Sequence, residues 1–318
     1  MFRGFVFTAD NVTEKNDPAE VIKDLKNSRA RTWIDLEDPT EQEIDFLIQE
    51  FDFHPLSIED AMIQKDHPKL EEFDDYSFAI FYAARIADGE IKEDQLNIFI
   101  GKNYIVTIHE EKIRAVERVI ARARSRAKNG FHQGVDLVFH ALADNTIDEY
   151  FPIIEKIEDR LDEFEDVILE ERKLEIIDEI ITQKRNILFL RKLITAERGI
   201  FTRLLKGEMR YIRESTQVYF RDIFDHLSEM NATLENLRDL IPSLMDAYNS
   251  LMNKKTNDAI HGLTVAATIA IPLTVLTSYY GMNIYLPFAD KGIWGWMFVN
   301  GILIFSGILT YLFLKKIK

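Results

Sequence analysis

Two stretches near the C-terminal end of the chain contain no charged side chain, and this feature constrains the fold more than any other. No Asp, Glu, Lys or Arg lies between Asp258 and Asp290 or within residues 293–314. Residues 259–280 and 293–314 are each 22 residues long, which is enough for a helix to cross about 30 Å of hydrocarbon. A buried helical hairpin of a soluble protein is the alternative, and two such stretches make it the weaker one. We therefore predict an integral membrane protein with transmembrane helices at 259–280 and 293–314.

The lysines beside these stretches predict the orientation of the chain. Lys254 and Lys255 precede the first stretch, and a basic tail at residues 315–318 follows the second. Basic residues beside a span favour the cytosolic side. Residues 1–10 lack the long apolar core of a signal peptide. We therefore expect a multi-pass protein of the cell membrane (inner or plasma membrane), with both termini cytoplasmic and an external loop at 281–292.

Negative charge is concentrated outside the two stretches. The whole chain has a formal net charge of −15; residues 259–318 contain four lysines and one aspartate, a balance of +3, so residues 1–258 carry −18. Nucleic acid needs a basic surface, so we expect no nucleic-acid partner. An acidic domain favours cations, although a solvated acidic surface also keeps a protein soluble. The chain contains no cysteine, which excludes disulfides, zinc thiolates and a cysteine nucleophile.

The two predicted spans differ in polarity. The second is apolar apart from Asn300, Ser306 and Thr310, as expected for a helix that faces lipid. The first contains Pro272, which is expected to kink it, and a series of polar residues: Asn257, His261, Thr264, Thr268, Thr274, Thr277 and Ser278. Such residues serve close helix packing or line a water-filled path. Two helices cannot enclose a channel, so a chain that conducts ions would need several copies arranged with cyclic symmetry.

Residues 1–130 alternate strand and helix patterns, which predicts a cytosolic α/β domain with a mixed sheet. Strands are predicted at 2–8, 32–36, 76–84, 95–100 and 104–109, the last two joined by a turn at 101–103. Helices are predicted at 18–26, 41–51, 55–61 and 111–128. Thr40 and Glu43 have the spacing of a capping box at the start of the second helix.

After residue 134 the pattern is helical. Apolar residues recur at three- and four-residue steps through 150–168, and a second helix is expected at 174–205. We interpret 131–210 as a cytosolic helical hairpin and 211–258 as a stalk helix that continues into the first span. A helix unbroken from 211 to 280 would be about 105 Å long. Pro242 lies within it and is expected to kink it or mark a joint.

One tetrapeptide stands at the end of the first predicted span, directly before the loop between the two spans. It reads Tyr280-Gly281-Met282-Asn283. In this position it resembles the signature of the CorA magnesium transporter family. Further similar segments support the resemblance, which covers nearly the whole chain: Tyr219-Phe220-Arg221-Asp222, Lys255-Thr256-Asn257 and Ile271-Pro272-Leu273-Thr274.

The resemblance implies an α+β membrane protein that assembles as a funnel-shaped homopentamer, with the first spans around the pore and the second spans outside them. Gly281, Met282 and Asn283 would form the selectivity filter, where a ring of Asn283 carbonyls hydrogen-bonds hydrated Mg²⁺ without stripping its tightly held water. The implied pore-lining positions lie on one helical face: Asn257, Ile260, Leu263, Ala267, Ile271, Thr274 and Ser278. A competing and more polar face runs through His261, Thr264 and Thr268; the sequence alone does not choose between the two.

The resemblance also implies regulation by Mg²⁺, which would be both the transported and the regulatory ion. Asp222 and Asp246 match family positions for regulatory Mg²⁺ between subunits, and Asp88 is an implied opposing ligand. Bound Mg²⁺ would cancel the repulsion between neighbouring carboxylates and hold the pore shut.

The external loop departs from the family pattern, in which an acidic Met-Pro-Glu segment follows the filter. Residues 284–291 contain only Asp290 and Lys291 as charged residues, which weakens the concentration of cations at the entrance. Ion preference therefore stays open, with Co²⁺ or Ni²⁺ as secondary ions. The alternatives are a zinc transporter on the same scaffold and a membrane-anchored enzyme or sensor. Neither a zinc-binding cluster nor a catalytic motif is visible in the sequence.

Overall fold

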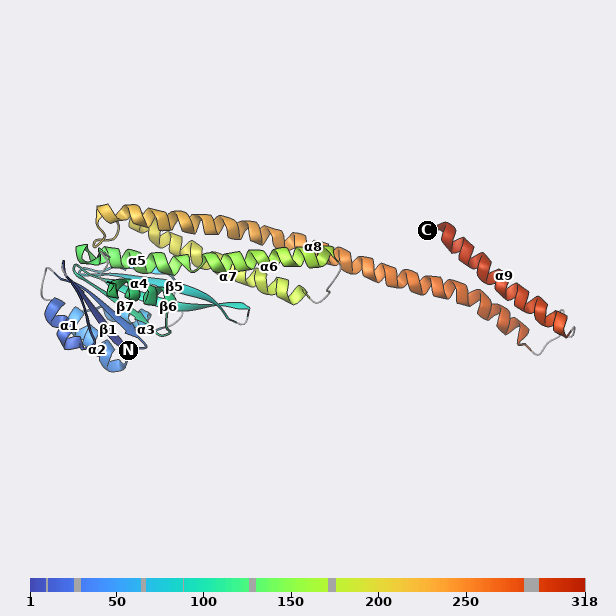
Figure 1. Cartoon of the computed structure of the whole chain (residues 1–318), viewed down its shortest axis with the longest axis horizontal. Coiled ribbons are helices and arrows are strands. Elements are labelled where there is room, and N and C mark those ends of the chain that lie inside the picture. Colours follow the sequence, from blue (N-terminus) through green and yellow to red (C-terminus); the bar gives the residue numbers. More distant parts are fainter. Residues whose placement is uncertain are drawn as a thin grey trace. The chain divides into compact units, whose positions relative to one another are not determined.

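The computed structural model describes residues 1–9, 11–25, 30–63, 67–87, 89–125, 130–170, 176–282 and 292–317. The chain divides into two units, Met1–Leu244 and Met245–Lys318 (Figure 1). The first unit contains the sheet and most of the helices, and the second contains the two apolar segments.

A seven-stranded mixed sheet forms the centre of the first unit, in the order β2-β1-β3-β7-β6-β5-β4. Its strands are β1 (Phe2–Phe7), β2 (Val12–Lys15), β3 (Arg31–Glu37), β4 (Lys69–Glu72), β5 (Ser77–Ala87), β6 (Glu90–Ile100) and β7 (Tyr104–His109). Strands β3 and β7 are parallel, and every other pair is antiparallel. The predicted mixed sheet is confirmed, and all five predicted strands are present. The short edge strands β2 and β4 were not predicted, and β6 begins earlier than expected.

Helices cover both faces of this sheet. In chain order, the helices up to residue 280 are α1 (Pro18–Leu25), α2 (Glu41–Phe51), α3 (Pro55–Met62), α4 (Arg114–Arg124), the 3-10 turn η1 (Phe131–Gln133), α5 (Val135–Asp148), α6 (Phe151–Leu169), α7 (Ile177–Leu205) and α8 (Glu214–Tyr280). In Figure 1, α1 and α2 lie on one side of the sheet and α5 on the other.

The ends of two helices show how local sequence fixes the elements. The predicted capping box is present: the Thr40 hydroxyl accepts from the Glu43 N–H, and the Glu43 carboxylate accepts from the Thr40 N–H at 2.8 Å. In contrast, the helix predicted at 111–128 begins only at Arg114. Ile113 is 2% exposed and extended, so burying its side chain in the core takes precedence over an earlier helix start.

A buried ionic cluster ties three neighbouring strands together. Arg3 on β1 donates to Asp35 on β3 at 2.6 Å, and His109 on β7 lies 3.2 Å from the same carboxylate. Burial alone would raise the pKa of Asp35, but the hydrogen bond and charge of His109 and the charge of Arg3 outweigh burial and hold it below its usual value. Breaking such a buried pair leaves an uncompensated charge, which costs about 3–5 kcal/mol.

A second buried polar group joins α7 to the sheet. Glu197 is fully buried and accepts from the Tyr82 N–H of β5 at 3.1 Å and from the Tyr150 hydroxyl, between α5 and α6, at 2.9 Å. Burial raises the pKa of Glu197 to about 8, although these two hydrogen bonds oppose the shift. Glu197 is therefore largely protonated at neutral pH.

Two segments dominate the second unit, the C-terminal part of α8 and α9 (Ile293–Ile317). Helix α8 starts three residues later than predicted and is assigned as one helix through Pro242 and Pro272. Pro242, where a kink or joint was predicted, lies two residues before the boundary between the units. Both predicted apolar segments are thus helices long enough to span a membrane.

The raised pKa of Glu197 predicts a pH-dependent stability. An unfolded Glu titrates near 4.5 and the buried one near 8, so the folded state holds a proton that the unfolded state loses as pH rises. The contribution of protonated Glu197 to the free energy of unfolding is fully present below pH 4.5 and is lost as the pH rises through 8. Glu197→Gln keeps a neutral amide in place and should raise the free energy of unfolding above pH 8 by on the order of 4 kcal/mol.

The measurement is thermal unfolding of the purified chain between pH 5 and pH 9, followed by near-ultraviolet circular dichroism. Exposed Glu165 on α6 provides the matched control, Glu165→Gln. A native chain and a Glu197→Gln variant with the same dependence of Tm on pH would contradict the assignment.

Candidate functional site

The C-terminal part of α8 is exposed nearly all round. Its most apolar 18-residue stretch has 0% of its residues buried, and that of α9 has 6%. A core helix of a soluble protein would be mostly buried, and a signal sequence would lie near the N-terminus, so neither explains these helices. Exposed apolar helices of this length must be covered by lipid or by other protein, as the predicted membrane spans require.

The predicted pore-lining positions lie on one open face of α8. Ala267 is half-buried, whereas the other six are exposed: Asn257, Ile260, Leu263, Ile271, Thr274 and Ser278. Leu263 is 72% exposed. The competing face is open as well, with His261 and Thr264 exposed and Thr268 half-buried. Exposure in a single chain therefore leaves both faces available to neighbouring molecules.

Threonine hydroxyls of α8 donate hydrogen bonds to backbone carbonyls of the same helix. Thr264 donates to the Ile260 carbonyl at 2.8 Å, Thr268 to Thr264 at 2.7 Å and Thr274 to Ala270 at 2.8 Å. A hydroxyl that donates to its own helix keeps only lone pairs for outside partners. These side chains therefore offer acceptor oxygens, which suit a cation or the water around it.

The end of α8 explains one residue of the signature tetrapeptide. The Gly281 N–H donates to the Thr277 carbonyl at 2.9 Å. A side chain at position 281 would place its Cβ 3.2 Å from that carbonyl, so glycine allows the close approach. Met282 is exposed. Asn283 and residues 284–291 lie outside the described residues.

Two of the three predicted regulatory aspartates, Asp222 and Asp246, lie within the described residues. The Asp222 side chain is 71% exposed, and its carboxylate lies 4.0 Å from His226, which is also 4.0 Å from Asp148 on α5. Burial, together with nearby Asp144, raises the pKa of Asp148. Asp246 is exposed in the second unit, and Asp88 lies outside the described residues.

Asp148 and His226 were not predicted as neighbours of Asp222. The four-residue spacing of Asp222 and His226 on a helix was a usable signal, whereas the approach of Asp148 depends on tertiary packing. Among the residues that the structure describes, no three His, Asp or Glu side chains are arranged to hold a metal ion.

Comparison with known proteins decides the family. Residues 28–316 match the family described as CorA-like Mg²⁺ transporter protein. The chain is 30% identical over 310 residues to the cobalt/magnesium transport protein CorA of Thermotoga maritima, covering 96% of this chain and 88% of that protein. The chain belongs to the CorA family. A putative metal ion transporter of Bacillus subtilis, YfjQ, is 31% identical over 276 residues, covering 87% of this chain and 85% of the relative.

The CorA fold extends over the whole chain. The complete structure of the CorA magnesium transporter from Methanocaldococcus jannaschii covers 98% of this chain and 96% of that one, with a TM-score of 0.81 at 21% identity. The zinc transport protein ZntB of Photorhabdus laumondii is a more distant relative, at 25% identity over 68% of this chain and 66% of its own. CorA proteins are membrane transporters of divalent cations and not enzymes, so membership excludes the membrane-anchored enzyme.

Proposed function

We propose that this CorA-family chain forms a homopentameric channel in the cell membrane that carries hydrated Mg²⁺ into the cytosol, down its electrochemical gradient. The observation that carries the proposal is the open face of α8, which combines apolar residues with acceptor oxygens in a chain whose described residues contain two candidate spans. Family membership supports a divalent cation as the substrate.

The number of spans requires several copies. A pair of packed helices leaves no lumen between them, and this chain supplies two long apolar helices. Copies of α8 arranged with cyclic symmetry would cover the exposed face and enclose a path. Helix α9 exposes large apolar side chains such as Trp294, Phe305 and Leu309, which suits a helix placed outside that ring and against lipid.

The filter would lie at the external end of α8, at Gly281, Met282 and Asn283. Mg²⁺ binds six oxygens in near-ideal octahedral geometry and loses its water reluctantly. A ring of neutral Asn283 carbonyls would hydrogen-bond the hydration shell, which attracts the ion without trapping it. Gly281 supports this arrangement because it allows the last turn of α8 to close tightly against Thr277.

Below the filter, polar and apolar rings would alternate along the pore. Thr274 and Asn257 would provide polar rings near the two ends, and Ile260, Leu263 and Ile271 would form an apolar constriction that closes by excluding water. The Thr274 hydroxyl donates its hydrogen to the Ala270 carbonyl, so only its oxygen lone pairs remain for the ion's water. This supports a role for Thr274 as a polar ring.

Both termini would lie in the cytosol. Gating would depend on aspartates shared between the cytosolic parts of neighbouring subunits. Asp222 and Asp246 are exposed, so each is accessible to a neighbouring copy, and Asp88 would supply an opposing ligand. A regulatory Mg²⁺ would need ligands from two copies, because the described residues of one chain do not form a metal site. Bound Mg²⁺ would screen the repulsion between carboxylates and favour the closed state.

Co²⁺ and Ni²⁺ are proposed as secondary ions, and Zn²⁺ as the alternative substrate. Zinc sites favour histidine and cysteine ligands. The chain contains no cysteine, and His261, the histidine within the first span, is exposed on the competing face of α8. These features favour Mg²⁺ over Zn²⁺.

The filter assignment predicts that Asn283→Ala strongly slows Mg²⁺ entry. The protein is reconstituted in liposomes that contain a fluorescent Mg²⁺ indicator, and influx is driven by a membrane potential. Removing the ring of amides should reduce the initial rate by about tenfold or more. Asn300→Ala, on α9, is the matched control and should leave the rate nearly unchanged.

Native influx rates in the Asn283→Ala variant would refute the filter. A native protein that passes no Mg²⁺ but moves Zn²⁺ when a pH gradient is applied would replace Mg²⁺ by the alternative substrate.

The gating assignment predicts that Asp222→Lys weakens inhibition by cytosolic Mg²⁺. A lysine ammonium would stand where the regulatory cation binds, so bound Mg²⁺ would no longer be needed to relieve carboxylate repulsion. Flux would therefore depend less on the cytosolic Mg²⁺ concentration. The measurement is flux against Mg²⁺ concentration on the cytosolic side, with exposed Asp162→Lys on α6 as the charge-matched control. Inhibition of Asp222→Lys at native Mg²⁺ concentrations would remove Asp222 from the gating site.

A further inference from the structure

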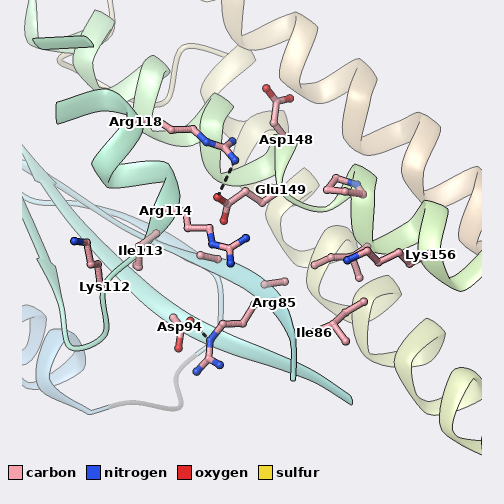
Figure 2. A pocket seen from close by; sticks show the side chains of 14 residues that line it. Arg85, Ile86, Asp94, Lys112, Ile113, Arg114, Arg118, Asp148, Glu149 and Lys156 are labelled. Carbon is pink, nitrogen blue, oxygen red and sulfur yellow. Dashed lines mark hydrogen bonds and ion pairs between the residues drawn. The ribbon is translucent and has the colours of Figure 1, made fainter. Parts of the chain in front are cut away.

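A basic pocket lies in the first unit, within a strongly acidic part of the chain. Its volume is about 290 Å³, and it is bounded by the β5–β6 hairpin, the start of α4 and the junction between α5 and α6 (Figure 2). Five of its lining side chains are basic: Arg85, Lys112, Arg114, Arg118 and Lys156. Three are acidic: Asp94, Asp148 and Glu149. A basic majority is unexpected where residues 1–258 carry −18.

The acids of the pocket leave part of this positive charge uncompensated. Asp94 accepts from Arg85 at 2.9 Å, so these two charges offset each other. Asp148 points away from the centre of the pocket in Figure 2 and lies 4.0 Å from His226. Glu149 is 3.7 Å from Arg118, which is longer than a charge-assisted hydrogen bond.

Arg114 and Lys156 are exposed, and in the described part of the chain neither forms a hydrogen bond or ion pair with an acid. The charge of Arg114 acts on Glu149, where it opposes the rise in pKa that burial causes. Figure 2 shows Arg114 on α4 and Lys156 on α6 extending toward the same space. Two cations in one pocket repel each other. An anion bound between them attracts both and offsets that repulsion. Arg114 is also the first residue of α4, and its N-cap Ile113 provides no side-chain acceptor, so the leading N–H groups add positive potential.

We propose that this pocket binds a phosphate group, with Arg114 and Lys156 as its main ligands and Arg118 as a third. The planar guanidinium matches two phosphate oxygens at once, and the lysine ammonium adds a point charge. The volume is near the lower end of the range of about 300–1,000 Å³ for small-molecule sites. It therefore suits inorganic phosphate or the phosphates of a nucleotide.

Glu149 gives the pocket a means of selecting phosphate. Its side chain is only 12% exposed, and a carboxylate there would repel a fully ionised anion. A phosphate that retains a proton can instead donate a hydrogen bond to this carboxylate, whereas sulfate has no proton to donate near neutral pH. Phosphate should therefore bind more tightly than sulfate, although basic side chains alone would treat the two alike.

The test is isothermal titration calorimetry of the full chain in detergent micelles, with inorganic phosphate, sulfate and ATP as separate probes. We expect saturable phosphate binding, with sulfate and the double variant Arg114→Gln/Lys156→Gln each weaker by about tenfold or more. Lys23→Gln/Lys102→Gln makes the same change in charge at exposed positions outside the pocket and should alter affinity less than about twofold. Tighter binding of ATP than of phosphate would identify nucleotide phosphates as the ligand; equal or weaker binding would identify free phosphate.

Absence of saturable binding for phosphate and ATP at millimolar concentrations would overturn the proposal. An equal loss in the Lys23→Gln/Lys102→Gln control would also overturn it, since binding would then reflect general electrostatic attraction. Sulfate bound as tightly as phosphate would refute the role of Glu149. Each variant is also unfolded by heat, and a Tm equal to that of the native chain shows that a loss of binding is not a loss of folding. Lys156→Gln alone provides a milder second variant.

Discussion

The lack of water inside a bilayer is the constraint on which the rest of this structure depends. Backbone groups in hydrocarbon must be hydrogen-bonded within the protein, and a helix does this within a single segment; in this chain α8 and α9 have the length and composition to do so. Two helices leave no lumen, however. Under the proposed function, transport would therefore require surfaces that remain open in one chain and become covered when copies assemble.

Both parts of the candidate site have this property. The face of α8 that carries Leu263 and Thr274 is exposed, and so is Asp222 near the N-terminal end of the same helix. By contrast, the ionic cluster that joins the strands of the first unit is buried and paired within the chain, as in the contact of Arg3 with Asp35. Internal pairs hold the first unit together, whereas the exposed surfaces are the ones proposed to contact ions and neighbouring copies.

Much of the fold could be predicted because its signals are local. The capping box at Thr40, the strand alternation at 104–109 and the uncharged spans each specify their own element within a few residues. The edge strands β2 and β4 were missed because they are four residues long and largely polar, so they lack an apolar pattern. The start of α4 was misplaced because the burial of Ile113 is a tertiary effect.

The positions proposed for the pore share one helix, so helical spacing places them on a common face, but the choice of that face over the one through His261 came from the resemblance to the CorA family. Contacts between elements were not predictable. Asp148 approaches His226 only through the packing of α5 against α8, and Arg85, Arg114 and Lys156 come together from three elements. In the sequence these basic residues are scattered among a larger number of acids, so no average over neighbouring positions shows a basic pocket.

The central claim is that a ring of copies builds the pore. Native mass spectrometry of the full chain, released from lipid nanodiscs, counts the chains in each particle directly. The account predicts particles of five chains that persist in lipid. Particles of one or two chains, isolated from a preparation that still transports Mg²⁺, would contradict it, because neither can enclose a path for the ion.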